Sequence, residues 1–466
     1  MQKLIILHSN DIHGHVEGLA RIATLVEQMR AEHPDIPVLY LDAGDSEETS
    51  HRLSNLTKGV GMHRLLSAAG CAAATVGNGG LLRYSQYILK EYARVARYPH
   101  LLANLRNPDG SIPEGVQATT MLEADSLKLG IIGLTAVKFD EDLMYEKYFG
   151  LHAPNSSMLV HELADELRQQ GADVVILLSH LGLPDDVMLS LKIQNVVPLI
   201  IGAHTHNLIP GGVWSGSILI TQAGEFAGHL GRLDLIWDGE RLQIERVSVI
   251  PVTEDIPPAP RVQAEIVAIE AEVEQMLNDV IGTLAESLDF TAERECGVGN
   301  LMADALRVRT GAEVAIVEAG QAFTGPLSAG PLRRIALWEV CSSSANPGVV
   351  EMTGAQLLAI VQRGQNPTFA AEITRVNRGK PRGFLHLSGA STRAGQLYIG
   401  TQPVKAEGVY KVAGSDWELG NYGGYTDAAW NLRPTYEIQT IMRDVVEEYL
   451  KGEPALSVQM GRLDLS

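Results

Sequence analysis

The segment His8-Ser-Asn-Asp11-Ile-His13-Gly-His15 directly follows the apolar run Leu4–Leu7 and carries one aspartate and three histidines in eight residues. A short apolar run bounded by polar residues and glycine is consistent with a buried strand. In layered α/β domains, sites form just beyond the carboxyl ends of strands. The segment therefore predicts the end of a first strand, with metal-binding side chains in the loop after it.

Four further motifs also begin where an apolar run ends. They are Gly44-Asp45, Gly77-Asn78, Ser179-His180 and Gly202-Ala-His204-Thr-His206. Alone, a Gly-Asp or Gly-Asn pair after a strand is also typical of a turn. Five such strand ends in order, however, would bring two aspartates, one asparagine and four histidines together. Seven ligands suit two ions that share a bridging carboxylate, and mixed imidazole and carboxylate donors favour Mn, Zn, Co or Fe over Ca.

Apolar runs alternate with amphipathic segments through the first 250 residues, which favours a layered α/β domain. The strand candidates are Leu4–Leu7, Val38–Leu41, Ala73–Val76, Leu101–Ala103, Ile131–Leu134, Val174–Leu178, Leu199–Ile201 and Ile218–Thr221. The helix candidates are Leu19–Arg30, Met62–Ala69 and Leu159–Gln169.

The composition is that of a globular protein, with 45% hydrophobic and 20% charged residues. The net charge of −19 argues against a nucleic-acid polymer or a membrane surface as partner, since both favour basic surfaces. Of the 14 histidines, only His386 lies beyond residue 250, so we expect the first half to hold the chemistry. The sequence leaves the oligomeric state open.

The chain is long enough for two large domains or three smaller ones. Val252–Pro260 contains three prolines and is expected to be a stiff linker, and Arg261–Leu277 has helical spacing. We therefore predict a metal-binding domain over 1–250, a linker and connecting helix over 251–288, and a second domain over 289–466. The apolar run near the N-terminus is too short for a signal peptide, which favours a cytoplasmic protein.

These motifs together resemble those of the calcineurin-like metallophosphoesterases, and more narrowly those of the two-domain 5′-nucleotidase family. Leu41-Asp-Ala-Gly-Asp45-Ser and Leu178-Ser-His180-Leu-Gly are similar to family signatures in the first half. Gly299-Asn300-Leu-Met-Ala-Asp304, Glu351-Met-Thr-Gly and Asn421-Tyr-Gly-Gly-Tyr425 are similar to motifs of the C-terminal domain. The resemblance implies an α/β class: a four-layer α/β/β/α sandwich followed by an α+β substrate-binding domain.

The resemblance also implies roles for single residues. One metal ion would be held by Asp11, His13 and His206. The other would be held by Asn78, His180 and His204, with Asp45 bridging the two. His15 would lie just outside the metal ligands and steer a ligand or water, or would be an exposed loop histidine.

The chain departs from the family at its catalytic dyad. The family reads Gly-Asn-His-Glu followed by an Asp, whereas this chain has Gly79 in place of the His and Leu82 in place of the Asp. Arg83 and His51 are substitute candidates, with a surface arginine as the alternative reading of Arg83. Loss of a positioned acid/base group typically costs about 10²–10⁴-fold in rate.

The second domain departs too. The phosphate-binding arginine of the family is absent from the segment Val317–Phe323, which contains Gly320. The family holds the base between two aromatic rings. Tyr425 matches one of them, and Phe323 or Tyr422 is a candidate for the other, although core or turn positions are the alternative.

Three functional hypotheses follow. The first is a phosphoester hydrolase with two divalent ions that acts on a nucleotide or a related phosphorylated small molecule. The second is a metal- and nucleotide-binding protein with weakened catalysis, motivated by Gly79 and Leu82. The third is a hydrolase of UDP-sugars, 2′,3′-cyclic nucleotides or sulfur-linked groups, the last disfavoured because those relatives are exported.

Overall fold

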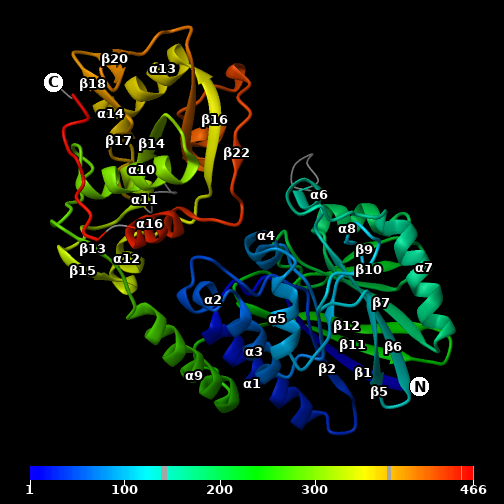
Figure 1. The fold of residues 1–466 in the computed structure, drawn as a ribbon. Helices are drawn as coiled ribbons and strands as arrows, with labels where there is room; N and C mark the ends of the chain where they lie inside the picture. Colours follow the sequence, from blue (N-terminus) through cyan, green and yellow to red (C-terminus); the bar gives the residue numbers. More distant parts are fainter. Residues whose placement is uncertain (138–143, 375–378, 453, 465–466) are drawn as a thin grey trace. The chain divides into compact units, whose positions relative to one another are not determined.

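The computed structural model describes residues 1–137, 144–374, 379–452 and 454–464 (Figure 1). The chain divides into two compact units, Met1–Val273 and Glu274–Ser466, and the division falls within the segment 251–288 expected to connect the domains. In the described ranges, no helix combines the length and the apolar character needed to cross a bilayer. Cys71, Cys296 and Cys341 are buried free thiols.

Two six-stranded sheets form the centre of the first unit. The first sheet consists, in spatial order, of β12 (Leu242–Pro251), β11 (His229–Trp237), β1 (Gln2–Ser9), β2 (Val38–Asp42), β3 (Ala73–Thr75) and β4 (His100–Leu101). The second consists of β5 (Thr119–Ala124), β6 (Leu127–Thr135), β7 (Val174–His180), β8 (Leu199–Gly202), β10 (Ile218–Thr221) and β9 (Val213–Ser215).

The sheets pack face to face because alternate residues of each strand point to opposite sides. Ile176 and Leu178 of β7 join a core with Leu4 and Ile6 of β1 from the other sheet. The alternate residues of β7, Val175 and Leu177, pack instead against α7 (Ser156–Gln169). This arrangement is the expected α/β/β/α sandwich (Figure 1).

Helices cover the outer faces of both sheets (Figure 1). On the side of the first sheet lie α1 (Val16–Glu32), α2 (Arg52–Leu56), α3 (Val60–Ala69), α4 (Gly79–Tyr84) and α5 (Ile88–Val95). On the side of the second sheet lie α7 and α8 (Leu183–Ser190), with the short α6 (Met144–Phe149) before them. The helix α9 (Pro260–Leu277) is bound to α3 by ion pairs from Arg64 to Glu265 (2.6 Å) and Glu272 (2.9 Å).

The strands that carry the sequence motifs run parallel. Strands β1 to β4 are parallel neighbours in one sheet, and β6, β7, β8 and β10 are parallel neighbours in the other. Their carboxyl ends therefore lie at one edge of each sheet, as the sequence predicted. The antiparallel strands β5, β9, β11 and β12 were not predicted.

A mixed five-stranded sheet forms the centre of the second unit. Its order is β17 (Leu385–Ser388), β14 (Val314–Glu318), β21 (Val409–Ser415), β16 (Pro347–Thr353) and β22 (Thr435–Tyr436). Smaller sheets pair β13 (Val280–Leu284) with β15 (Gly330–Arg333), and β18 (Ala390–Arg393) with β19 (Gln396–Ile399) and β20 (Gln402–Pro403). The helices are α10 (Gly297–Thr310), α11 (Ala319–Ala322), α12 (Arg334–Val340), α13 (Gly354–Gly364), α14 (Pro367–Ala370), α15 (Asp416–Leu419), α16 (Met442–Lys451) and the short η1 (Asn421–Gly423) and η2 (Ala428–Trp430).

His386, the one histidine of this unit, is fully buried in β17. Its Nε2 accepts a hydrogen bond from the Cys296 amide (2.9 Å), and its Nδ1 donates one to the Phe384 carbonyl (2.9 Å). Burial lowers the pKa of His386 to about 4 from its ordinary value of 6.5. It is therefore a neutral core histidine, and its protonation at low pH favours the unfolded chain.

We expect His386 to make the second unit acid-sensitive. The pKa of His386 is lower in the folded than in the unfolded chain. Its contribution to the free energy of unfolding is therefore fully present above pH 6.5 and falls by about 3 kcal/mol as the pH drops to 4. A His386→Gln variant lacks this loss, so the difference in unfolding free energy between wild type and variant should narrow over that range. Urea unfolding at several pH values measures the difference, and a constant difference would contradict the assignment.

Candidate dinuclear metal centre

The loops after five strands place the candidate ligands. Asp11 and His13 follow β1, Asp45 follows β2 and Asn78 follows β3 in the first sheet. From the second sheet, His180 ends β7, and His204 and His206 follow β8. The ligands thus come from both sheets, and the face-to-face packing of the sheets determines whether they meet.

Five of these residues have left-handed backbone conformations. Their φ angles are +50° at Asp11, +47° at His13, +55° at Asp45, +72° at His204 and +57° at His206. Residues with a Cβ adopt this region at a cost of order 1 kcal/mol each, and such residues cluster at functional sites. The fold therefore holds these side chains in positions that relaxed loops would avoid.

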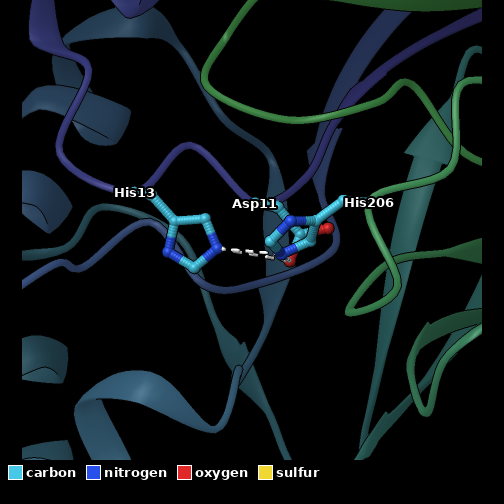
Figure 2. Close-up of side chains that lie close together, drawn as sticks. All are labelled: Asp11, His13 and His206. Carbon is cyan, nitrogen blue, oxygen red and sulfur yellow. Dashed lines mark hydrogen bonds and ion pairs between the residues drawn. The ribbon is translucent and has the colours of Figure 1, made fainter. Parts of the chain in front are cut away.

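Asp11, His13 and His206 form a first group (Figure 2). The Nε2 atoms of His13 and His206 lie 3.1 Å apart. Asp11 Oδ1 lies 3.8 Å from the first of these nitrogens and 3.5 Å from the second. Three donor atoms at these distances can surround one cation.

Asp45, His180 and His204 form a second group. Asp45 Oδ2 lies 3.2 Å from His180 Nε2, and the rings of His180 and His204 are 5.2 Å apart. The two groups adjoin, because Asp11 Oδ1 is also 3.9 Å from His180 Nε2. Asp11 is thus within 4 Å of nitrogens from both groups, whereas the resemblance gives the bridging role to Asp45.

Asn78 lies beside Asp45. The amide of Gly79, the next residue, donates to Asp45 Oδ1 (2.7 Å), and a Cβ at Gly77 would lie 2.0 Å from the same oxygen. The Asn78 Oδ1 atom is buried and makes no hydrogen bond. Buried polar atoms rarely lack a partner, so this oxygen fits the requirements of a bound metal ion.

Three of the imidazoles are fixed by their Nδ1 atoms. His180 Nδ1 donates to the Ala43 carbonyl (2.7 Å), His206 Nδ1 to Glu225 Oε2 (2.5 Å), and His13 Nδ1 to the Glu47 carbonyl (3.3 Å). Each bond turns Nε2 into the site, where it can bind a cation once it carries no proton. Such outer hydrogen bonds accompany most metal-binding histidines.

The site concentrates buried negative charge. Asp11, Asp42, Asp45 and Glu47 are all buried. Burial raises the pKa of Asp11, and it raises the pKa values of Asp42 and Glu47 to about 7. Since carboxylates in such surroundings favour any available cation, the cluster attracts metal ions.

His180 and Asp45 form a charged pair in this cluster. Burial alone would lower the pKa of His180, but Asp45 raises it to about 10. Burial would raise the pKa of Asp45, but His180 lowers it below its ordinary value. A proton on His180 thus occupies the position that a cation would take, so binding of a metal ion would release this proton.

The dyad positions provide no acid or base. Gly79 begins α4, and Leu82 packs beside a buried cluster that contains Leu81 and Leu89. Of the substitute candidates, Arg83 lies over the ring of Tyr84 (5.3 Å). His51 precedes α2, with its ring 4.7 Å from that of His15.

The loop after β10 contributes residues that the sequence did not reveal. Glu225 binds His206, and the ring of Phe226 lies 5.9 Å from that of His13. The strand Ile218–Thr221 was predicted, but the loop after it contains none of the His-x-His or Gly-Asp patterns that mark the other ligands. An acidic and an aromatic residue after Gly224 were the only sequence signal.

Two of the candidate substrate residues of the second unit are packed in its core. Tyr425 and Phe323 are fully buried, and the Tyr425 hydroxyl donates to Glu318 Oε2 (2.7 Å). Gly320 allows a close chain approach, because a Cβ there would lie 2.4 Å from the Pro381 carbonyl. Tyr422 belongs to η1, and its side chain lies outside the described residues.

The described site has counterparts in known proteins. The calcineurin-like phosphoesterase family matches residues 4–208, and the 5′-nucleotidase C-terminal domain family matches residues 280–429. The uncharacterized metallophosphoesterase YunD of Bacillus subtilis is 26% identical over 361 residues, which cover 76% of this chain and 77% of that protein. A 5′-nucleotidase of Diplobatis ommata is 28% identical over 345 residues, which cover 65% of this chain and 59% of that protein.

Solved structures share the fold over nearly the whole chain. A 5′-nucleotidase precursor from Thermus thermophilus has a TM-score of 0.58 at 20% identity, with 99% of both chains covered. A putative 5′-nucleotidase from Staphylococcus aureus has a TM-score of 0.65 at 17% identity, with 98% of both covered.

The fold and the two ligand groups therefore define a calcineurin-like metallophosphoesterase, a class of phosphoester hydrolases that use divalent metal ions. Together with the C-terminal match, they show that the chain belongs to the two-domain 5′-nucleotidase family.

We expect a Glu225→Gln substitution to weaken metal binding at the first group. The amide accepts a weaker hydrogen bond from His206 Nδ1, and loss of such an outer partner typically lowers metal affinity about 10–100-fold. Isothermal titration with Mn²⁺ measures the change. Glu240→Gln, in an exposed turn, is the matched control. Equal affinities in all three proteins would show that Glu225 does not support the site.

Proposed function

We propose that this protein hydrolyses phosphoesters of small molecules, most readily nucleotides, with two divalent ions of Mn, Zn, Co or Fe. Asp11, His13 and His206 would hold one ion, and Asp45, Asn78, His180 and His204 the other. The observation that carries the proposal is the pair of adjoining ligand groups, in which Asp11 Oδ1 lies within 4 Å of nitrogens from both. The names of the relatives, which include 5′-nucleotidases and an apyrase, support a nucleotide substrate.

Two such ions, when bound, lower the pKa of an attacking water and neutralise phosphoryl oxygens. The chain itself supplies fixed geometry. Its left-handed loops and the Nδ1 hydrogen bonds hold the imidazoles in one orientation, so little rearrangement is needed when substrate arrives. Neither Gly79 nor Leu82 has a side chain that can donate or accept a proton at the transferring phosphoryl group. We therefore expect turnover to be slower than with a complete His-Asp dyad.

Phosphate release from a substrate panel tests the proposal. We expect chelator-treated protein to be inactive and Mn²⁺ or Co²⁺ to restore hydrolysis of AMP, UDP-glucose or 2′,3′-cyclic AMP. For the last two substrates, an added phosphatase releases phosphate from the phosphomonoester products. An Asp45→Asn variant should lose at least about 10²-fold, whereas His161→Gln, in an exposed part of α7, should keep full activity. Metal-loaded wild-type protein that hydrolyses no member of the panel would contradict the proposal.

A second candidate function is metal and nucleotide binding with weakened catalysis, and the residues Gly79 and Leu82 favour it. A Cβ at Gly79 would lie 3.3 Å from Asp45 Oδ1, so a histidine there fits after a small shift. On this hypothesis, the double variant Gly79→His, Leu82→Asp gains about 10²-fold or more in kcat. Efficient turnover by the wild type, with no gain in the variant, would exclude it.

A further inference from the structure

The ring of Phe226 lies in the open beside the first ligand group. It is 45% exposed, and its centroid is 5.9 Å from the ring of His13 and 6.3 Å from that of His206. On another side it lies 4.6 Å from the ring of His15, at an interplanar angle of 34°. The proposed hydrolysis assigns no role to this ring.

The backbone at this ring is strained. Phe226 has a φ of +59° and Ala227 a φ of +53°, and they are the only adjacent non-glycine residues with left-handed φ in the described part of the chain. Glycine would adopt these left-handed φ angles at no steric cost. A bulky apolar side chain that is both strained and exposed to water therefore needs another explanation.

The loop that carries the ring is held firmly. The Phe226 amide donates to the carbonyl of Asp11 (2.8 Å), and the Asn10 side chain donates to the carbonyl of Gly224 (2.6 Å). Behind the loop, Gly18 of α1 leaves so little room that a Cβ there would lie 2.7 Å from the Ala227 Cβ. The ring is consequently positioned before any ligand arrives, which reduces the entropic cost of binding.

We infer that Phe226, together with the ring of His15, is a stacking platform for a planar group of the substrate whose phosphate binds at the metal centre. This inference rests on the proposed function and specifies its substrate class: phosphoesters of alcohols that carry a nucleobase or another aromatic ring. The buried state of Phe323 and Tyr425 supports it, because neither ring offers a face for stacking. Stacking tolerates changes of base, so adenine and uracil nucleotides should be hydrolysed alike.

AMP and ribose 5-phosphate form the matched substrate pair, since they have the same ester linkage and differ in the base. We expect wild-type protein to prefer AMP, and Phe226→Leu to reduce the ratio of kcat/KM values for AMP and ribose 5-phosphate about tenfold. The loss should appear in the KM for AMP, because stacking acts on bound substrate and transition state equally. Phe226→Trp should retain the preference. Trp214→Leu, at a ring that is 58% exposed outside the site, should leave all constants unchanged.

Two results would overturn the stacking inference and leave the proposed hydrolysis in place. One is turnover of both substrates with the same ratio in wild type and Phe226→Leu. The other is an equal fall in kcat for both substrates, which indicates that the ring only supports the Glu225–His206 contact; Mn²⁺ content measured on each variant identifies this case. If metal-loaded wild type releases no phosphate from any substrate, the proposed function fails, and the inference fails with it.

Discussion

The mutual repulsion of buried carboxylates at the ends of β1 and β2 is the constraint on which the first unit depends. Asp42, Asp45 and Glu47 lie close together in the sequence, Asp11 follows the neighbouring strand, and all four are removed from water. Charges in such surroundings are stable only when they are protonated, paired or bound to cations. The imidazoles from β7 and β8 and the proposed metal ions supply that compensation to Asp11 and Asp45 across the two sheets. Glu47 pairs instead with His63 of α3, and Asp42 accepts a hydrogen bond from the Ser9 hydroxyl.

Both sheets contribute to placing the side chains that compensate these carboxylates. Parallel strands bring five loops to one edge, and the core of Leu4, Ile6, Ile176 and Leu178 fixes the distance between the sheets. Left-handed residues then turn the side chains toward each other. Four of the 13 histidines of the first half are the candidate nitrogen donors at these positions, whereas His386 belongs to the core of the second unit.

Much of this arrangement could be predicted from the sequence. The buried parallel strands and the helices α1, α3, α7 and α9 were predicted within a few residues, because their apolar spacing is regular. The ligand candidates could be named because each follows such a strand. The strands β11 and β12 were missed, since partly exposed antiparallel strands show no continuous apolar run.

The remaining features depend on contacts distant in sequence. Glu225 reaches His206 only because a loop after β10 folds over Asp11, and no local pattern encodes that path. In the second unit, Tyr425 matches a family motif, but its ring is fully buried and its hydroxyl donates to Glu318. The same carboxylate also accepts hydrogen bonds from Arg382 and Trp417. Motif similarity identified the position, and only the packing around it revealed that the ring is not free.

Anomalous X-ray diffraction from crystals grown with Mn²⁺ tests the central claim most directly. The account predicts two anomalous peaks about 3.5–4 Å apart, one against His13 and His206 and the other against His180 and His204. No peak, or peaks away from these side chains, would contradict the claim that the buried carboxylates assemble a dinuclear metal centre.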